Sequence, residues 1–266
     1  MTTSPEELEL IELTPEGTFT FHCHPGVPCF NDCCAQTTIV LSPYEVLRLK
    51  QYLGLSAAEF LRLYTRREAD PASGLPLVLL QLRQDERRSC PFSSPAGCQV
   101  YPARPAACRY YPVGVGHWWS EAGLEEGAVY FREAHCCGFS GDRTWTLATW
   151  RRNQGLEEYD ELNRSWKSIL LRVAARANRP VSARLREEFY SYLYDLEVFK
   201  NFIFTTDFLN LFAVEAEVLA AMQTDEVALL RFAYRYFTFM LRLEDCLPLK
   251  ERRHPAGTKE NQEDKQ

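Results

Sequence analysis

Cysteine is the residue type whose number and spacing in this chain point most directly to chemistry. Nine of the ten cysteines lie within the first 137 of the 266 residues, and only Cys246 stands apart. Clustered thiolates are the ligands that hold zinc and iron–sulfur centres in proteins. A chain of this length buries a hydrophobic core without crosslinks, so the thiols indicate a bound metal. The candidate ligands are Cys23, Cys29, Cys33, Cys34, Cys90, Cys98, Cys108, Cys136 and Cys137.

The number of thiols bears on which metal is bound. One tetrahedral zinc ion needs four ligands, and the nine clustered cysteines exceed that number. We therefore favour an iron–sulfur cluster, first of all a four-iron (4Fe–4S) cluster, with zinc as the alternative. One centre and two centres both remain open, as does the question of which of the nine cysteines are ligands.

Composition and termini indicate where such a protein works. The amino-terminal residues have neither the basic start nor the apolar stretch of a secretory signal, so we expect a cytoplasmic protein with reduced thiols. A formal net charge of −6 disfavours nucleic acid as a partner. The chain contains no apolar run of about 18 or more residues, so we expect no membrane span. Another protein is the kind of partner that we still consider.

The hydrophobic pattern predicts an α+β fold that is mostly helical. Residues 1–143 form a small, irregular, cysteine-rich metal-binding half with a few strands, whereas residues 144–249 form a helical half. The charged residues 250–266 are predicted to be a disordered tail. Gly114, Val115 and Gly116 are predicted to form a turn between strands.

Short patterns locate the individual elements. Two capping boxes begin at Ser42 and Ser56, and Gly54 is expected to end the first of the two helices. Periodic apolar residues predict the remaining helices. We expect strands near 18–22, 37–41, 75–84 and 127–133, and helices near 42–53, 56–67, 156–177, 182–199, 207–222 and 224–241.

Charged and imidazole side chains adjoin the thiols. Arg104 and Arg109 flank Cys108 in the sequence, and we expect them to balance the negative charge of a thiolate-bound cofactor. His22 and His135 directly precede cysteines, and His24 directly follows one. We expect these imidazoles to donate hydrogen bonds to thiolates or to lie in solvent rather than to bind metal.

The cysteine pattern resembles the YkgJ-type cysteine-cluster family, also described as the CxxCxxCC or zinc- or iron-chelating domain. The resemblance covers about residues 19–112, with an extension to Cys137 left open, and implies metal chelation. In that family two residues usually separate the first two cysteines, whereas five separate Cys23 from Cys29 here. The matching residues are Cys33-Cys34, Cys90-Pro91-Phe92, Gly97-Cys98, Tyr101-Pro102-Ala103-Arg104-Pro105 and Cys108-Arg109 followed by Pro112.

Three functions follow from this resemblance and from the residues. The first is a metal-chelating protein that serves in electron transfer, in metal handling or as an accessory to an enzyme. The second draws on the similarity of the cysteine pattern to flagellin lysine N-methylases, and is a metal-dependent transfer of methyl groups from S-adenosylmethionine to protein lysine. The third is a zinc-stabilised interaction module without catalysis. The sequence does not decide whether the protein is an enzyme.

Overall fold

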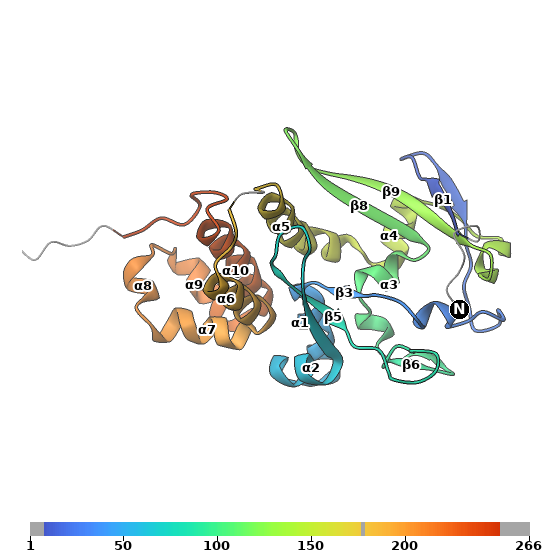
Figure 1. Ribbon diagram of the computed structural model, residues 1–266, viewed down its shortest axis with the longest axis horizontal. Helices are drawn as coiled ribbons and strands as arrows, with labels where there is room; N and C mark the ends of the chain where they lie inside the picture. Colours follow the sequence, from blue (N-terminus) through green and yellow to red (C-terminus); the bar gives the residue numbers. More distant parts are fainter. Residues whose placement is uncertain (1–7, 177–178, 251–266) are drawn as a thin grey trace, which may run out of the picture.

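The structure of the protein is a computed structural model that describes residues 8–176 and 179–250. Ten α-helices and ten short strands lie within these ranges, which confirms the predicted mostly helical α+β class. Residues 251–266 of the predicted tail lie outside the described ranges. Figure 1 shows the β1–β9–β8 sheet at one end of the molecule and helices α6–α10 at the other, with α5 between them.

The strands form small antiparallel sheets, and all but one of them belong to the amino-terminal half. Within the described ranges no sheet has more than three strands. The sheets consist of β1 (Leu8–Glu12), β9 (Gly123–Glu133) and β8 (Val113–Ser120); β3 (Val40–Leu41), β5 (Pro76–Leu80) and β4 (Thr65–Ala69); β10 (Thr144–Thr146) and β2 (Thr18–Thr20); and β6 (Ser93–Ser94) and β7 (Gly97–Cys98).

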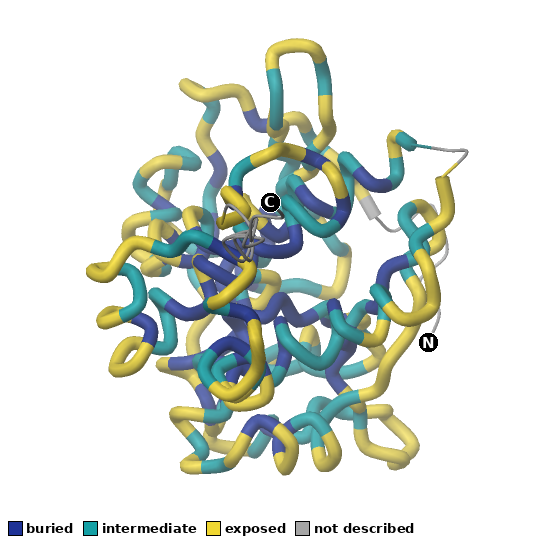
Figure 2. The backbone as a smooth tube through the Cα atoms, turned by 90° about the vertical axis from the view of Figure 1, so that its left-hand side faces the viewer, coloured by how far each residue is buried: buried dark blue, intermediate teal, exposed yellow. Residues whose placement is uncertain are grey.

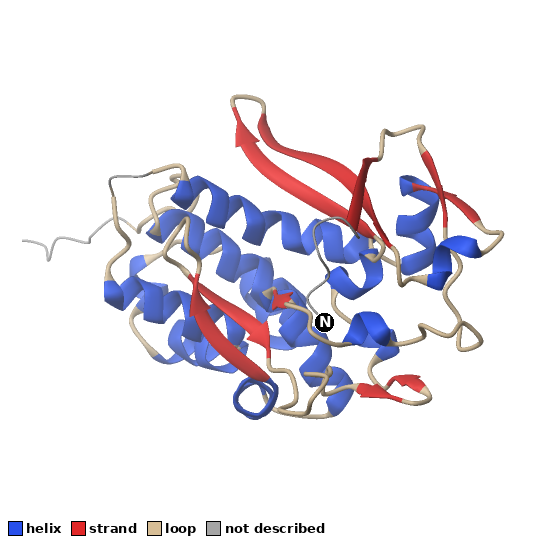
Figure 3. Ribbon diagram, turned by 45° about the vertical axis from the view of Figure 1, so that its right-hand side comes forward, coloured by secondary structure: helices blue, strands red, loops and turns tan. Residues whose placement is uncertain are grey.

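Helices supply the rest of the regular structure (Figure 3). Three of them precede residue 144, and seven follow it. The helices are α1 (Pro43–Leu53), α2 (Ala57–Tyr64), α3 (Ala106–Tyr110), α4 (Leu147–Gln154), α5 (Glu157–Ala174), α6 (Ala183–Tyr194), α7 (Leu196–Thr205), α8 (Phe208–Leu211), α9 (Ala216–Thr224) and α10 (Glu226–Met240).

Both predicted capping boxes are present. The Ser42 side chain accepts from the backbone N–H of Glu45, and the Glu45 carboxylate accepts from the backbone N–H of Ser42. Ser56 and Glu59 make the same reciprocal pair at the start of α2. Each box satisfies two backbone donors that a helix start otherwise leaves without a partner. Gly54 ends α1 in the left-handed conformation, as predicted.

Two helices predicted as continuous are broken in the structure. The segment 182–199 divides at Asp195, whose extended backbone separates α6 from α7 and whose carboxylate accepts from Val198 N at the start of α7. The segment 207–222 divides after α8. There Phe212 bridges Leu249, and the backbone N–H of Ala213 donates to Pro248. A distant segment thus takes hydrogen bonds that a continuous helix would make internally.

Two other predictions about strands are wrong. Gly114, Val115 and Gly116 lie inside β8 rather than in a turn, because the strand pairs with β9 along its whole length. The helix that follows Ser56 ends at Tyr64 rather than near residue 67, and the next residues form β4 against β5. Pairing with a neighbouring strand decides both cases, and a local pattern does not report that pairing.

One connected hydrophobic core extends through both halves. Buried residues from Leu13 to Leu247 belong to the same cluster, and Figure 2 shows the buried stretches inside the molecule with exposed turns around them. Helix α1 contacts α5, α6 and α10. Its Tyr44 ring packs edge-on against Tyr159, with 5.1 Å between the ring centroids. Helix α1 therefore joins the cysteine-rich half to the helical half.

Candidate metal centre

Backbone hydrogen bonds bring the first and second cysteine segments together. The backbone N–H of Cys90 donates to the carbonyl of Cys34 at 2.7 Å, directly after the bridge between Ala35 and Ser89. The short β6–β7 hairpin then places Cys98 opposite Ser93. Three cysteines that lie far apart in the sequence, Cys34, Cys90 and Cys98, therefore come from adjoining stretches of backbone.

Helix α3 brings a fourth thiol to this place. Cys108 lies on α3, whose first N–H, that of Ala106, donates at 2.7 Å to the Glu45 carboxylate of α1. Glu45 is only 3% exposed, and burial raises its pKa. Glu45 was predicted only as part of a capping box. Its second role, holding the helix that bears Cys108, depends on a contact across 61 residues of sequence.

The thiols around Cys34 influence each other's ionisation. A hydrogen bond from Cys33 lowers the pKa of Cys34 to about 7. Burial, followed by the charges of Cys34 and Cys98, raises the pKa of Cys90 to about 11. Cys108 is an exposed residue, but protein atoms keep water away from its sulfur. This desolvation is the largest cause of its raised pKa, and the charge of Cys34 is the second. We call Cys34, Cys90, Cys98 and Cys108 the Cys34 group.

A second set of thiols surrounds Cys29. The backbone N–H of Cys137, at the start of a 3-10 turn (Cys137–Ser140), donates to the Cys29 sulfur at 3.1 Å. The side chains of Cys136 and Cys137 also share hydrogen bonds with Cys29, and both of their pKa values are raised. Burial and then the charge of Cys136 raise the pKa of Cys23 to about 11. We call Cys23, Cys29, Cys136 and Cys137 the Cys29 group.

The two groups adjoin each other. Cys23 of the Cys29 group lies near enough to Cys34 for the charge of Cys34 to raise its pKa. The pKa of Cys33 is raised first by its hydrogen bond with Cys34 and further by the charges of Cys23 and Cys108. Cys33 thus lies between the two groups. All ten cysteines are free thiols.

The donor set fits a thiophilic metal, although the side chains do not converge on a point. Within 8–176 and 179–250, no three His, Cys, Asp or Glu side chains have the arrangement of a metal site. Each group nevertheless supplies four thiols, the number that one tetrahedral zinc ion or one four-iron cluster takes. Soft thiolate donors select zinc, copper(I) or iron–sulfur clusters over hard cations.

The two arginines occupy different surroundings. The Arg104 guanidinium lies 3.7 Å from the centroid of the Tyr101 ring. Burial raises the pKa of Cys98, and the charge of Arg104 partly opposes that rise. Arg109 donates to the carbonyls of Arg104 at 2.9 Å, of Gln154 at 2.6 Å and of Pro102 at 2.6 Å. Arg104 therefore adjoins the Cys34 group, whereas Arg109 fastens the loop before α3 to the end of α4.

Two histidines that adjoin cysteines in the sequence lie beside carboxylates, and the tenth cysteine lies far from both groups. His22 lies 3.5 Å from the Asp142 carboxylate, and His135 lies 4.0 Å from Glu133. Cys246 follows α10, where its sulfur contacts the carbonyl of Arg235. The structure thus keeps Cys246 apart from the nine clustered cysteines.

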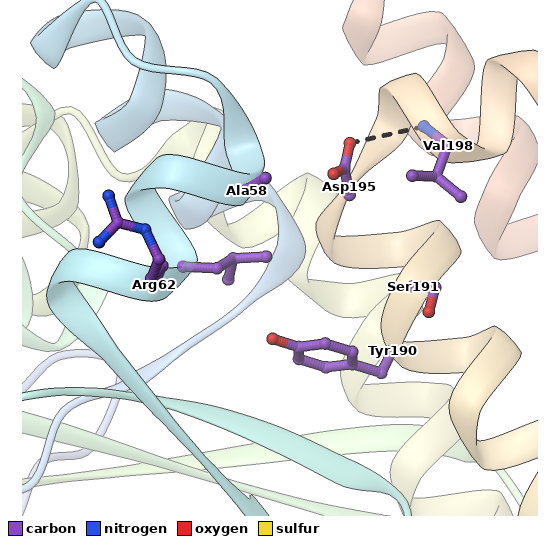
Figure 4. Close-up of a pocket in the computed structure, with 7 residues that line it drawn as sticks. Ala58, Arg62, Tyr190, Ser191, Asp195 and Val198 are labelled. Atoms are coloured by element: carbon purple, nitrogen blue, oxygen red, sulfur yellow. Dashed lines mark hydrogen bonds between the residues drawn. The ribbon is translucent and has the colours of Figure 1, made fainter.

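Two surface depressions lie elsewhere, and neither is lined by a cysteine. One, of about 340 Å³, lies between α2 and the α6–α7 junction, and is lined by Ala58 on one side and by Tyr190 and Asp195 on the other (Figure 4). The other, of about 560 Å³, lies on the β1–β9–β8 sheet.

Comparison with known proteins identifies the cysteine-rich segment. None of the helices in the described ranges is long and apolar enough to cross a membrane. The curated proteins and the solved structures yield no significant match to the chain. Residues 22–145 match the family model CxxCxxCC, whose description reads "Putative zinc- or iron-chelating domain", which is the family that the cysteine pattern of this segment resembles.

Proposed function

We propose that this protein binds an iron–sulfur cluster in the cytoplasm and that the Cys34 group supplies its ligands. The observation that carries the proposal is the meeting of four thiols from three separate segments around Cys34. The charge of Cys34 raises the pKa of each of the other three thiols, which supports their lying near one another. The match of residues 22–145 to the model of a zinc- or iron-chelating domain supports the binding of a metal.

The surplus of thiols favours iron over zinc. Zinc alone is satisfied by four ligands in a closed shell, yet the Cys29 group places four further thiols beside the Cys34 group. Clusters of iron and sulfide are held mostly by thiolate ligands, the donors that both groups supply. We also propose that the thiols of the Cys29 group hold a second centre or exchange metal with the first.

An accessible centre suits transfer to a partner. Cys23 and Cys33, whose thiols adjoin the Cys34 group, are exposed residues, so a centre bound there lies near the surface. We infer a role in electron transfer, in metal handling or as an accessory to an enzyme, with a protein as partner. When bound, the cluster supplies a reversible one-electron couple, and the chain supplies thiolate ligands and the positive charge of Arg104.

Anaerobic purification tests the proposal. We expect a brown protein with a broad visible absorption shoulder and with iron and acid-labile sulfide in equal amounts. A reversible reduction followed by visible absorption supports electron transfer. A colourless protein with stoichiometric zinc contradicts the iron–sulfur assignment and supports a zinc-stabilised module instead.

Ligand variants locate the centre. Cys98→Ser and Cys108→Ser are expected to abolish the visible absorption, whereas Cys246→Ser, which changes a thiol outside both groups, preserves it. If Cys136→Ser and Cys137→Ser remove the absorption while Cys98→Ser leaves it intact, the cluster belongs to the Cys29 group and the assignment to the Cys34 group is wrong.

A further inference from the structure

The outer face of the β1–β9–β8 sheet is a surface that the metal site does not use. The inner face packs on the core through Val113, which is 3% exposed, and through Tyr130 against Phe19. In Figures 1 and 3 the helices lie to one side of the β8–β9 hairpin. Alternation along the strands places the depression of about 560 Å³ on the opposite side.

Glycines form the floor of this depression, and aromatic rings stand at its ends. The Phe131 ring lies over Gly114, where a Cβ would overlap it, and the Trp118 ring lies over Gly127, where a Cβ would come within 3.2 Å of it. Gly116 lies in the depression with no side chain above it. Trp118 remains 47% exposed, so its ring is available to a ligand.

The charge on this face has one sign. The strand register places Glu125 opposite Trp118 and Glu12 opposite Val129, and both of these glutamates are exposed. No Lys or Arg occupies a position of this face in the three strands as described. Aromatic rings beside unbalanced carboxylates attract cations, because the ring face carries negative charge.

We propose that the outer face of the β1–β9–β8 sheet binds an extended, basic segment of a partner protein. Arginine or lysine side chains of that segment lie over the rings of Trp118 and Phe131, with Glu12 and Glu125 beside them. The glycine floor lets the partner's backbone approach the sheet closely. This surface lies beyond the proposed metal function, because no cysteine lines it.

Binding of a labelled peptide tests this surface. The probe is an octapeptide of alternating glycine and arginine, in which an extended conformation places every arginine on one side. Fluorescence anisotropy at low salt is expected to show binding to the full chain, and no binding of the matching glycine–glutamate octapeptide. Absence of arginine-peptide binding overturns the proposal, and so does equal binding of both peptides.

Substitutions separate this face from general acidity. Trp118→Ala is expected to weaken binding about fivefold, as for the loss of one cation–π contact. Gly116→Val keeps the strand, since a Cβ there meets only the Gly127 carbonyl oxygen at 3.9 Å, and is expected to block binding by filling the floor. The control is Glu9→Gln, on the same strand as Glu12 but on the other face, near Arg132.

Three results would contradict binding at this face. An equal loss with Glu9→Gln, or full binding by Gly116→Val, assigns the peptide to diffuse charge and overturns the site. A dimer that Trp118→Ala dissociates, observed by sedimentation, assigns the face to a second copy and overturns it as well. Because the assay reads peptide binding alone, its outcome is independent of whether the protein contains iron, zinc or neither.

Discussion

The charge of Cys34 raises the pKa values of thiols in both cysteine groups. It affects the pKa values of Cys90, Cys98 and Cys108 on one side and that of Cys23 on the other. Its own pKa of about 7 means that about half of this thiol is ionised at neutral pH, before any metal contributes. A residue with this position is expected to act first in metal capture.

We predict that Cys34→Ser lowers the affinity for metal by more than about 100-fold, beyond the loss caused by removing an outer hydrogen-bond partner. Serine does not ionise and is a poor ligand for soft metals. Competition with a chromophoric chelator measures the affinity. Cys246→Ser is the control, and an equal effect of the two substitutions would contradict a special role of Cys34.

Arg109 acts on the backbone rather than on the thiols in this structure. Its guanidinium satisfies three carbonyls, those of Pro102, Arg104 and Gln154, and stacks 4.5 Å from the Tyr159 ring. The residue is 9% exposed. A single ammonium group cannot reproduce such a fork of donors.

We predict that Arg109→Leu destabilises the protein by about 3 kcal/mol or more, because each buried carbonyl left without a donor costs about 1–3 kcal/mol. Urea unfolding of metal-free protein measures the change. Arg184→Leu, which removes an exposed pair with Glu188, is expected to change little. If Arg109→Leu alters metal binding alone, Arg109 belongs to the cofactor site as the sequence predicts.

Single side chains were predictable from the sequence to different degrees. The grouping of the cysteines in the sequence follows from their types and spacing, whereas their role as metal ligands and that of Arg104 and Arg109 beside Cys108 stay predictions. Glu45 could not be assigned its contact with Ala106. The sequence signal at Glu45 is the capping box, and the second hydrogen bond exists only once α1 and α3 pack together.

Helices and strands were predictable where their ends carry local signals. The boxes at Ser42 and Ser56 predict α1 and α2, since the capping hydrogen bonds lie within a few residues. The break after α8 was not predictable, because its backbone partner is Pro248, about 35 residues away. Strand β8 was missed because its glycines lie in a strand that pairing with β9 holds, and the Phe131 ring of β9 covers Gly114, a contact across strands.

The contact between β8 and α5 contains a histidine with unusual ionisation. His117 lies on β8, and the Lys167 Nζ of α5 lies 3.3 Å from its Nε2. Burial is the largest cause that lowers the pKa of His117 to about 4, and the charges of Lys167 and Arg164 add to it. The charge of Glu126 acts in the opposite direction. The folded protein therefore holds this imidazole neutral at a pH where the unfolded chain protonates it.

We predict that stability falls as the pH decreases from about 6.5 to about 4. In that range the unfolded state binds a proton at His117 that the folded state does not, which costs at most about 3 kcal/mol. His117→Gln is expected to flatten this part of the pH profile, as measured by urea unfolding at several pH values. A parallel profile for the variant would contradict the assignment, since the buried carboxylates Glu45 and Asp160 remain in both proteins.

The molecule as a whole is held together by contacts between its two halves. Tyr194 of α6 donates to the carbonyl of Leu41 at 3.3 Å, and Arg67 of β4 makes two hydrogen bonds, of 2.8 and 2.6 Å, with Glu187 of α6. Buried residues of α1 belong to the same cluster as those of α10. A division at residue 144 would expose much of this shared apolar surface.

We predict that the full chain unfolds in one transition on heating. Far-ultraviolet circular dichroism reports the helical half, while tryptophan fluorescence is dominated by the Trp118, Trp119, Trp145 and Trp150 side chains near the cysteine-rich half. The two signals are expected to coincide, as they do for a cooperative unit. Two separated midpoints would instead support independent folding of residues 1–143 and 144–249.

The hydrogen bond between Cys137 and Cys29 spans 108 residues of sequence, and this separation has a consequence for synthesis on the ribosome. At about 5–20 residues per second, the amino-terminal thiols emerge about 5–20 seconds before the last of their neighbours. During that interval Cys23, Cys29, Cys33 and Cys34 are nascent thiols without their later companions. Loading with the correct metal is therefore expected to follow translation of the whole segment, and chaperoning of the early thiols would protect them from oxidation meanwhile.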